Sequence, residues 1–316
     1  MLQSRRSVLL QLSIVAGAGF TGRPLVASEE SAGTAPKGAL SKKAPSKEAV
    51  SKEAVLALEK RAGGRLGVAV LDMSASSHFG HRADERFAMC STFKLLAVAF
   101  VLARVDRGEE QLARRVAFSR ADLLEHAPVA TARVAEGALS IAELCEASIT
   151  VSDNTAANLL LKSFGGPAAL TRYARTLGDG MTRLDRDEPM LNMATAGDPR
   201  DTTTPNAMLG NLKVLLTGDA LSKASCEQLC AWLVASKTGL ERLRAGLPAA
   251  WRAGDKTGSG NNGTTNDVAI VWPPERPPIL IAAYLTETRA TPAEKNGVFA
   301  DLARLVVAAS EPEPRR

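Results

Sequence analysis

The sequence of 316 residues contains little of what builds metal centres or disulfide frameworks, since it holds only three histidines and four cysteines. His78, His81 and His126 show no metal-binding spacing with cysteines or acidic residues. Cys226 and Cys230 stand four apart in a predicted helix, which separates their Cβ atoms by about 5–6 Å, too far for a disulfide. We therefore predict no metal, no cofactor and four free thiols that are mostly buried.

An excess of one charge is also missing from most of the chain. The net charge of +5 comes mainly from the start, because residues 1–28 carry +3 and residues 29–55 carry +1. Residues 56–316 keep only +1, which gives no electrostatic footprint for nucleic acid. No run after residue 28 is long and apolar enough to cross a membrane, so we expect no stable membrane span.

The first 28 residues have the pattern of an export signal. An Arg5-Arg6 pair precedes an apolar stretch that runs to Phe20, and residues 26–28 are small enough for cleavage. The pair resembles a twin-arginine signal, and an ordinary secretory signal is the alternative. Residues 29–52 are rich in Ser, Ala, Lys, Glu, Gly and Pro, which predicts a flexible linker.

Strands are expected at both ends of the folded part, with helices between them. A helix should end near residue 62, before a strand at 65–72 and a hairpin partner near 78–81. Two β-rich runs predict further strands at 266–272 and 278–285. Helices are predicted at 91–106, 140–150, 153–163, 167–177, 205–216, 222–235, 238–245 and about 293–309.

This order predicts an α+β fold, in which an antiparallel sheet is flanked by the terminal helices and an all-helical subdomain is inserted. Within one domain at 53–316, we place the sheet subdomain at about 53–88 and 236–316 and the helical subdomain at about 89–235. A cleft between the two subdomains is the natural position for a functional site.

Ser91 and Lys94 form a Ser-x-x-Lys pair at the start of the most apolar helical run. Residues three apart share one face of a helix, so the amine can hydrogen-bond the hydroxyl and help to remove its proton. Lys94 is the only charge between Ser91 and Phe100, and burying a lone lysine is costly unless it has partners. Alone, the pair is also explained by a chance match at a helix start.

Three further motifs follow along the chain. Ser152-Asp153-Asn154 begins a predicted helix, where one of these residues could simply be the N-cap. Glu188 and Asn192 lie in an irregular stretch and can hold one water between them, although a polar loop is the simpler explanation. In Lys256-Thr257-Gly258, the glycine lets backbone and a cation approach a carboxylate, and a turn with a solvated lysine is the alternative. Together, and in this order, the motifs indicate an active site.

The four motifs resemble those of the class A serine β-lactamases. The resemblance covers residue 53 to the end and includes the stretches 83–87, 152–158 and 197–205. It implies a β-lactamase fold and hydrolysis of penicillins and cephalosporins, with a small-molecule β-lactam as the only partner. We accordingly expect a monomer in the periplasm, similar to the chromosomal enzymes of Gram-negative bacteria.

The resemblance also implies the catalytic roles. Ser91 attacks the β-lactam carbonyl and becomes acylated, and the backbone N–H groups of Ser91 and Ser259 form the oxyanion hole. Lys94 and Glu188 are the two candidate bases for acylation. Glu188, together with Asn192, activates the water for deacylation. Ser152 relays a proton to the leaving ring nitrogen.

Substrate binding and one loop are assigned in the same way. Asn154 would bind the side-chain amide of the substrate, and its carboxylate would be received by Lys256, Thr257 and Ser259. The loop around Glu188 would be Ω-shaped and closed by an ion pair between Arg186 and Asp201. The bond between Glu188 and Pro189 would be a cis peptide, which proline tolerates.

Three positions depart from the usual pattern of the family. Thr265 stands where many members have an arginine, and Arg242, in the predicted helix before that strand, matches the place where others supply the cation. A surface arginine is the alternative for Arg242. His126 replaces the usual aromatic residue at the cleft mouth. Cys90 precedes the nucleophile, but Gly260 stands where some carbapenem-hydrolysing members have the partner cysteine, so that disulfide cannot form.

Two other functions share part of this pattern. A penicillin-binding DD-peptidase has the serine, the lysine and the Lys-Thr-Gly motif but normally lacks the water-activating glutamate. Glu188 with Asn192 therefore argues against it. A non-hydrolytic β-lactam sensor domain stays acylated and needs a membrane-spanning segment, for which no run after the signal is suited.

Overall fold

A five-stranded antiparallel sheet organises residues 50–310, the part of the chain that the computed structural model describes. From edge to edge, its strands are β2 (Ser77–His81), β1 (Arg65–Asp72), β9 (Ile279–Thr286), β8 (Thr265–Trp272) and β7 (Arg252–Ser259). Both ends of the described chain thus build one sheet, which confirms the predicted α+β fold. The predicted export signal and all but the last residues of the predicted linker lie outside the described residues.

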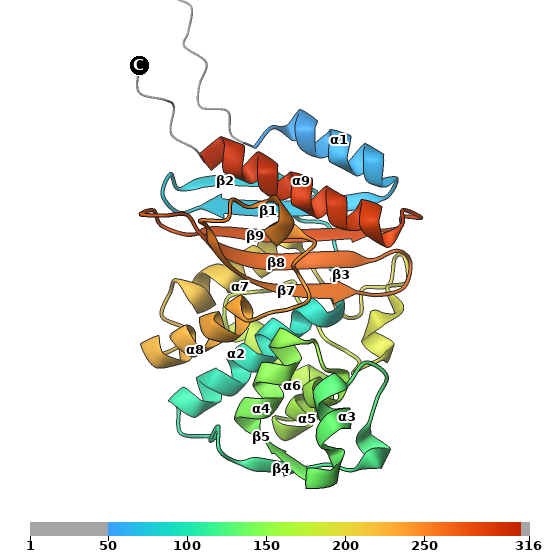
Figure 1. Cartoon of the computed structure of the whole chain (residues 1–316), viewed down its shortest axis with the longest axis vertical. Helices are drawn as coiled ribbons and strands as arrows, with labels where there is room; N and C mark the ends of the chain where they lie inside the picture. The colour runs from blue at the N-terminus through green and yellow to red at the C-terminus, as the bar shows by residue number, and fades with distance from the viewer. Residues whose placement is uncertain (1–49, 311–316) are drawn as a thin grey trace, which may run out of the picture. The chain divides into compact units, whose positions relative to one another are not determined.

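The terminal helices α1 (Lys52–Ala62) and α9 (Pro292–Ser310) lie side by side on one face of this sheet (Figure 1). Ser51 caps the start of α1, and Gly63, with a φ of 62°, ends it in the left-handed conformation that glycine adopts easily. Apolar residues of both helices and of β1 and β9 form one core on this face. Because helices cover both faces, β9 is buried along its whole length.

A second and larger core lies on the other face of the sheet. The helix α2 (Phe93–Asp106) runs through its centre, and ten of its 14 residues are buried. Around it lie α3 (Pro128–Arg133), α4 (Ile141–Thr150), α5 (Asn154–Ser163), α6 (Gly166–Thr176) and α8 (Lys223–Val234) (Figure 1). The helix α7 (Pro205–Leu216) packs directly against β1 and β9, although it falls inside the predicted helical subdomain.

The predicted helix at 238–245 is wrong. The structure has a turn there, followed by a short 3-10 helix, η5 (Leu243–Gly246). Gly239 passes so close to the sheet that a Cβ on it would lie 2.0 Å from the Asp255 carboxylate. The chain is therefore held against β7 by tertiary contacts, which override the local helical pattern.

Small elements without a strong sequence pattern were not predicted. They are α3 and two short strand pairs, β3 (Phe87–Ala88) with β6 (Thr202–Thr203) and β4 (Arg115–Ala117) with β5 (Ala138–Ser140). The pairing of β3 with β6 matters most, because it joins the segment before Ser91 to the end of the loop that contains Glu188. Within residues 50–310, none of the helices is long and apolar enough to span a bilayer.

Candidate active site

A cleft of about 290 Å³ lies between the β7 edge of the sheet and the helices beneath it. Most of its lining comes from the residues singled out in the sequence: Ser91, His126, Ser152, Asn154, Asn192, Arg242, Thr257 and Ser259, together with Thr238 and Gly258. Lys94, Glu188 and Lys256 lie beneath this lining and are almost fully buried. The structure therefore brings the four sequence motifs together at one site.

Ser91 lies on the short 3-10 helix η1 (Cys90–Thr92), which leads directly into α2. Cys90 has a φ of 45°, so the backbone just before Ser91 is in a conformation that non-glycine residues rarely adopt. The Ser91 hydroxyl is directed at Glu188, and Oγ donates to Oε1 over 3.3 Å. The serine is thus half-exposed to the cleft while its proton has an acceptor on the buried side.

Lys94 is fully buried and surrounded by acceptors. Its Nζ lies 2.6 Å from Asn154 Oδ1, 2.8 Å from the Ser152 backbone oxygen and 3.0 Å from Glu188 Oε1. These three contacts match the three protons of a lysine ammonium. Burial lowers the pKa of Lys94, because it disfavours the charged form, and the Glu188 carboxylate opposes that shift.

The side chains of Ser152 and Lys256 form the next link of the network. Lys256 Nζ donates to Ser152 Oγ over 3.1 Å and to the Thr257 backbone oxygen over 2.9 Å. Lys94 Nζ lies 3.3 Å from the same Ser152 oxygen. Burial and the charge of Lys94 lower the pKa of Lys256 to about 7. The Ser152 hydroxyl therefore lies between two amines that exchange protons more readily than a solvated lysine.

Glu188 is held in place by two asparagines. Asn192 Nδ2 donates to Glu188 Oε2 over 2.5 Å, and Asn192 Oδ1 is buried without a hydrogen-bond partner among the described residues. Asn158 clamps the backbone of Glu188, because its Oδ1 accepts from the Glu188 N–H and its Nδ2 donates to the Glu188 carbonyl, each over 2.9 Å. A buried acceptor without a partner usually marks the place of a water.

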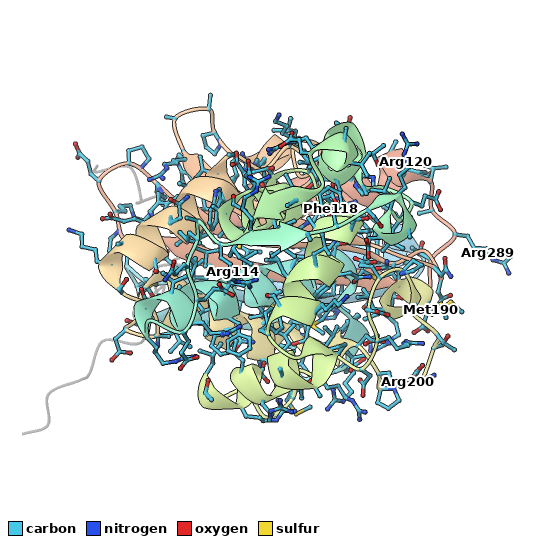
Figure 2. The ribbon with its side chains drawn as sticks, turned by 90° about the horizontal axis from the view of Figure 1, so that it is seen from below. Arg114, Phe118, Arg120, Met190, Arg200 and Arg289 are labelled. Carbon is cyan, nitrogen blue, oxygen red and sulfur yellow. The ribbon has the colours of Figure 1, made fainter. Side chains whose placement is uncertain are left out.

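The Ω-loop (residues 186–201) carries Glu188 and is closed at its base by a buried carboxylate. Asp201 accepts from the Arg186 guanidinium over 2.5 Å and from the backbone N–H groups of Asp185 and Arg186 over 2.8 and 2.9 Å. The bond between Glu188 and Pro189 is cis. Met190, which is 51% exposed, projects from the outer side of this loop (Figure 2). The loop is thus anchored at its base and exposed at its tip.

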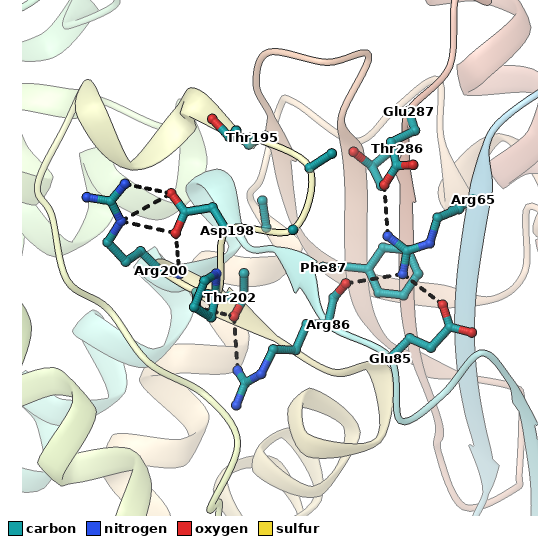
Figure 3. A pocket seen from close by; sticks show the side chains of 15 residues that line it. Arg65, Glu85, Arg86, Phe87, Thr195, Asp198, Arg200, Thr202, Thr286 and Glu287 are labelled. Carbon is teal, nitrogen blue, oxygen red and sulfur yellow. Dashed lines mark hydrogen bonds and ion pairs between the residues drawn. The ribbon is translucent and has the colours of Figure 1, made fainter.

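A second cavity, of about 320 Å³, is lined by the outer part of the Ω-loop and the ends of β3 and β9 (Figure 3). Arg65 pairs there with Glu85 and Glu287, and Arg200 pairs with Asp198. These charges neutralise one another, and none of the residues predicted to act in catalysis lines this cavity. The site of the chemistry is therefore the cleft at Ser91.

Arg242 faces the cleft from the turn before η5, and its predicted position in a helix is wrong. Its guanidinium donates to Ser259 Oγ over 2.8 Å and to the backbone oxygens of Gly258 and Asn266 over 2.9 and 2.7 Å. Its Nε donates to Asn296 Oδ1 over 3.3 Å, so all of its hydrogen-bond partners among residues 50–310 are uncharged oxygens. Since an arginine keeps its charge, this is a fixed cation that can attract an anion in the cleft.

The structure also places the other residues that differ from the usual family pattern. His126 is exposed at the cleft with a φ of 56°, and its ring contacts the Val151 backbone oxygen over 3.1 Å. Thr265 is buried away from the cleft lining. The Cys90 thiol is buried against Gly260, where a Cβ would lie only 2.6 Å from its sulfur, and burial raises the pKa of that thiol.

Sequence reasoning missed two residues that shape the site. Asn158 clamps Glu188, and Thr238 Oγ1 lies 2.6 Å from Thr257 Oγ1 at the cleft wall. The N-cap alternative for the Ser152-Asp153-Asn154 motif holds for Asp153, which caps α5 at Ala156 and also accepts from the N–H groups of Val129 and Ala130. Asn158 was within reach of the sequence, because it shares the α5 face with Asn154 four residues earlier. Thr238 had no comparable pattern.

The arrangement offers Ser91 as a nucleophile, Lys94 and Glu188 as nearby bases, and Arg242 as a fixed cation. Within the described range, no group of His, Cys, Asp and Glu is placed to hold a metal ion. A hydroxyl beside a carboxylate and an amine can attack a carbonyl. A carboxylate with a free amide oxygen beside it can orient a water. Lys256, Thr257 and Arg242 together can hold the carboxylate of a ligand.

Comparison with known proteins shows which family this chain resembles. Residues 50–309 match the family described as "Beta-lactamase enzyme family". The β-lactamase Toho-1 of Escherichia coli is 46% identical over 250 residues, which cover 79% of this chain and 86% of that protein. The β-lactamase OXY-2 of Klebsiella oxytoca is 44% identical over 249 residues, with the same coverage. A solved class A β-lactamase of the last common ancestor of Gram-negative bacteria is 60% identical, covers 82% of this chain and 98% of its own, and superposes with a TM-score of 0.81.

Proposed function

The chain belongs to the class A serine β-lactamases, and from this premise we propose a cycle in which the β-lactam ring acylates Ser91 and a water held by Glu188 and Asn192 releases the product. The enzyme hydrolyses the β-lactam amide of penicillins and cephalosporins. The roles of the individual residues rest on the contacts within the cleft.

Acylation begins with removal of the Ser91 proton. The hydroxyl donates to Glu188 Oε1, which also lies 3.0 Å from Lys94 Nζ, so Glu188 is the base in direct contact with the nucleophile. Lys94, in contact with the same carboxylate oxygen, accepts the proton from Glu188 and returns it to the network. The backbone N–H groups of Ser91 and Ser259 stabilise the oxyanion. Ser152 then donates its proton to the ring nitrogen and recovers it from Lys94 or Lys256, which lie 3.3 and 3.1 Å away.

Deacylation uses the opposite side of the same carboxylate. A water between Glu188 and Asn192 would supply the partner that Asn192 Oδ1 lacks. Glu188 takes a proton from this water, whose oxygen attacks the acyl carbon, and returns a proton to Ser91 Oγ as the ester bond breaks. Asn158 supports this step, because it fixes the Glu188 backbone from both sides.

Substrate recognition uses the strand side of the cleft. We propose that Lys256, Thr257, Ser259 and Arg242 bind the substrate carboxylate, that Asn154 binds the side-chain amide, and that His126 borders the cleft mouth. The favourable feature of Arg242 is that its guanidinium is oriented by four uncharged oxygens and still keeps an unpaired charge.

The observation that carries the proposal is the contact of Glu188 with Ser91, Lys94 and Asn192 at once. We expect the enzyme to turn over a penicillin and a chromogenic cephalosporin many times per active site. A single stoichiometric burst with no later turnover would instead indicate a DD-peptidase or a sensor domain. Ser91→Ala should abolish both turnover and the covalent mass increase, whereas Ser77→Ala, at an exposed position on β2, should change neither.

We also propose that the protein acts as a periplasmic monomer after export. The support is the signal pattern at residues 1–28, with its Arg5-Arg6 pair, and a cleft to which this one chain contributes every group. Fractionation of cells that express the full chain, with Arg5→Lys/Arg6→Lys as the matched variant, tests the twin-arginine route. Light scattering of the mature protein tests the oligomeric state, and a dimer mass would contradict the proposal.

A further inference from the structure

One buried asparagine contacts both halves of the cleft. Asn266 is fully buried on β8, opposite Gly258 of β7 in the sheet register. Its Nδ2 donates to the backbone oxygens of Ala88 and Met89, each over 2.9 Å. These two residues lead into the segment that carries Ser91. A single side-chain amide therefore ties the sheet to the chain just before the nucleophile.

Asn266 is also connected to the strand side of the cleft. Its backbone oxygen accepts from Arg242 Nη1 over 2.7 Å, and the same guanidinium donates to Ser259 Oγ over 2.8 Å. The side chain of Asn266 thus holds the Ser91 segment while its backbone holds the arginine that contacts Ser259. No other residue with these two connections occurs among the described side-chain hydrogen bonds.

The segment before Ser91 needs support because its backbone is strained. A non-glycine residue in the left-handed region is unfavourable and persists only where its surroundings enforce it. Cys90 is such a residue, with a φ of 45°. The packing beside it is tight, because a Cβ on Gly258 would lie 2.7 Å from the Met89 oxygen and 3.2 Å from Asn266 Nδ2. Only glycine lets β7 approach the Asn266 amide and the Met89 carbonyl this closely.

We propose that Asn266 is a positioning residue that sets the separation between the backbone N–H groups of Ser91 and Ser259. The inference rests on the proposed function, in which these two groups form the oxyanion hole. Without its bonds to Ala88 and Met89, the strained segment relaxes away from β7 and the two donors lose their common target. Acylation and deacylation both pass through a tetrahedral intermediate, so both steps slow together.

The test compares Asn266→Ala with Asn211→Ala. Asn211 is a matched control because it is also buried, its Nδ2 donates one hydrogen bond, to Asp179, and its Oδ1 is likewise without a partner within residues 50–310. It lies on α7 and does not line the cleft. Both substitutions remove a buried amide, so they should lower the melting temperature by similar amounts.

The decisive measurement is the inhibition constant of phenylboronic acid, whose boron binds a serine oxygen to give a tetrahedral adduct. This probe has no carboxylate, so it does not depend on Arg242. In Asn266→Ala we expect its affinity to fall about tenfold to a hundredfold, and kcat/KM for a penicillin to fall by the same factor. Asn211→Ala should leave both quantities within about twofold of the wild type.

The outcomes separate the inference from the proposed function. If Asn266→Ala binds phenylboronic acid as tightly as the wild type, Asn266 has only a structural role and the inference fails. If the wild type does not turn over a penicillin, the proposed function fails instead. Should Asn266→Ala not fold, Asn266→Ser and Asn211→Ser give the same comparison. Because Asn266→Ser retains a hydroxyl donor, its loss of affinity for phenylboronic acid should be smaller than the loss expected for Asn266→Ala.

Discussion

The two sides of the cleft hold their functional groups by different means. On the Ω-loop side, Glu188 depends on a few side chains, chiefly Asn158 at its backbone and Asp201 at the loop base. On the strand side, Lys256 and Thr257 belong to β7, which pairs with β8 along its full length. A loop held by single contacts can place a group where no regular element reaches, whereas a ladder keeps its groups in place when one side chain changes. We therefore expect substitutions of Glu188 and Asp201 on the loop side to affect catalysis, and those of Arg242 and Lys256, whose side chains face the ligand carboxylate on the strand side, to affect binding.

The largest effect should come from Glu188→Gln, which removes the base and keeps the shape of the side chain. Deacylation should slow by about a thousandfold, within the usual range for a general base, and by more than acylation, for which Lys94 remains as the second candidate base. Electrospray mass spectrometry should then detect a long-lived adduct on Ser91. Asp187→Asn, at the exposed neighbouring carboxylate, is the control and should turn over normally. Rapid loss of the adduct from Glu188→Gln would show that Glu188 is not the base for deacylation. The expectation that the loop side acts on catalysis would then fail.

Arg242→Ala tests the strand side and should act on KM. A hydrogen-bonded charge contributes about 1.5–3 kcal/mol, so KM for a penicillin should rise by about tenfold or more while kcat stays close to the wild-type value. Arg289→Ala provides the control, because Arg289 projects from the surface away from the cleft (Figure 2). Equal KM values for both variants would show that Arg242 is a structural arginine. The expectation that the strand side acts on substrate binding would then fail for this residue.

Asp201→Asn tests how far the Ω-loop depends on one contact. The amide keeps an acceptor for the Asp185 and Arg186 N–H groups but loses the charge that pairs with the Arg186 guanidinium. We expect a loss of about 2 kcal/mol in stability and a decrease of about tenfold in deacylation, with acylation less affected. Thermal unfolding and burst kinetics measure the two effects. Asp198→Asn, which weakens the pair with the exposed Arg200 and a longer contact of 3.7 Å with Arg186, should cost at most about 1 kcal/mol.

The sequence predicted the loop side and the strand side unequally well. Ser91 with Lys94, and Glu188 with Asn192, are separated by one helical turn or one short loop, and these pairs indicated a shared task once all the motifs were taken together and in order. The β-branched runs at 266–272 and 278–285 likewise became β8 and β9, because buried strands have a strong composition. Predictions from local patterns of this kind agree with the structure.

Contacts between distant segments were beyond the sequence. Arg242 was expected in a helix, but the close approach of Gly239 to Asp255 holds that segment in a turn. Asn266 showed no motif, since its partners Ala88 and Met89 lie 178 and 177 residues away. Such pairs are fixed by sheet register and by packing of the whole chain, which a single sequence does not reveal.

The smallest effect concerns the charge of Lys256 as the pH changes. Its pKa is lowered to about 7 in the folded protein, mainly by burial and then by Lys94, whereas an unfolded lysine keeps its proton to about 10.4. Above pH 7 the free enzyme therefore loses this cation, and KM for a penicillin should rise several-fold between about pH 6.5 and 8.5. The unfolded chain binds more protons in the window from about 7 to 10, so this group makes stability rise with pH while affinity falls. Lys256→Arg keeps its charge throughout and should show a flat KM profile, whatever its absolute value. A wild-type KM that is equally flat would mean that Arg242 alone attracts the carboxylate, and the strand side would then depend on a single residue just as the loop side does.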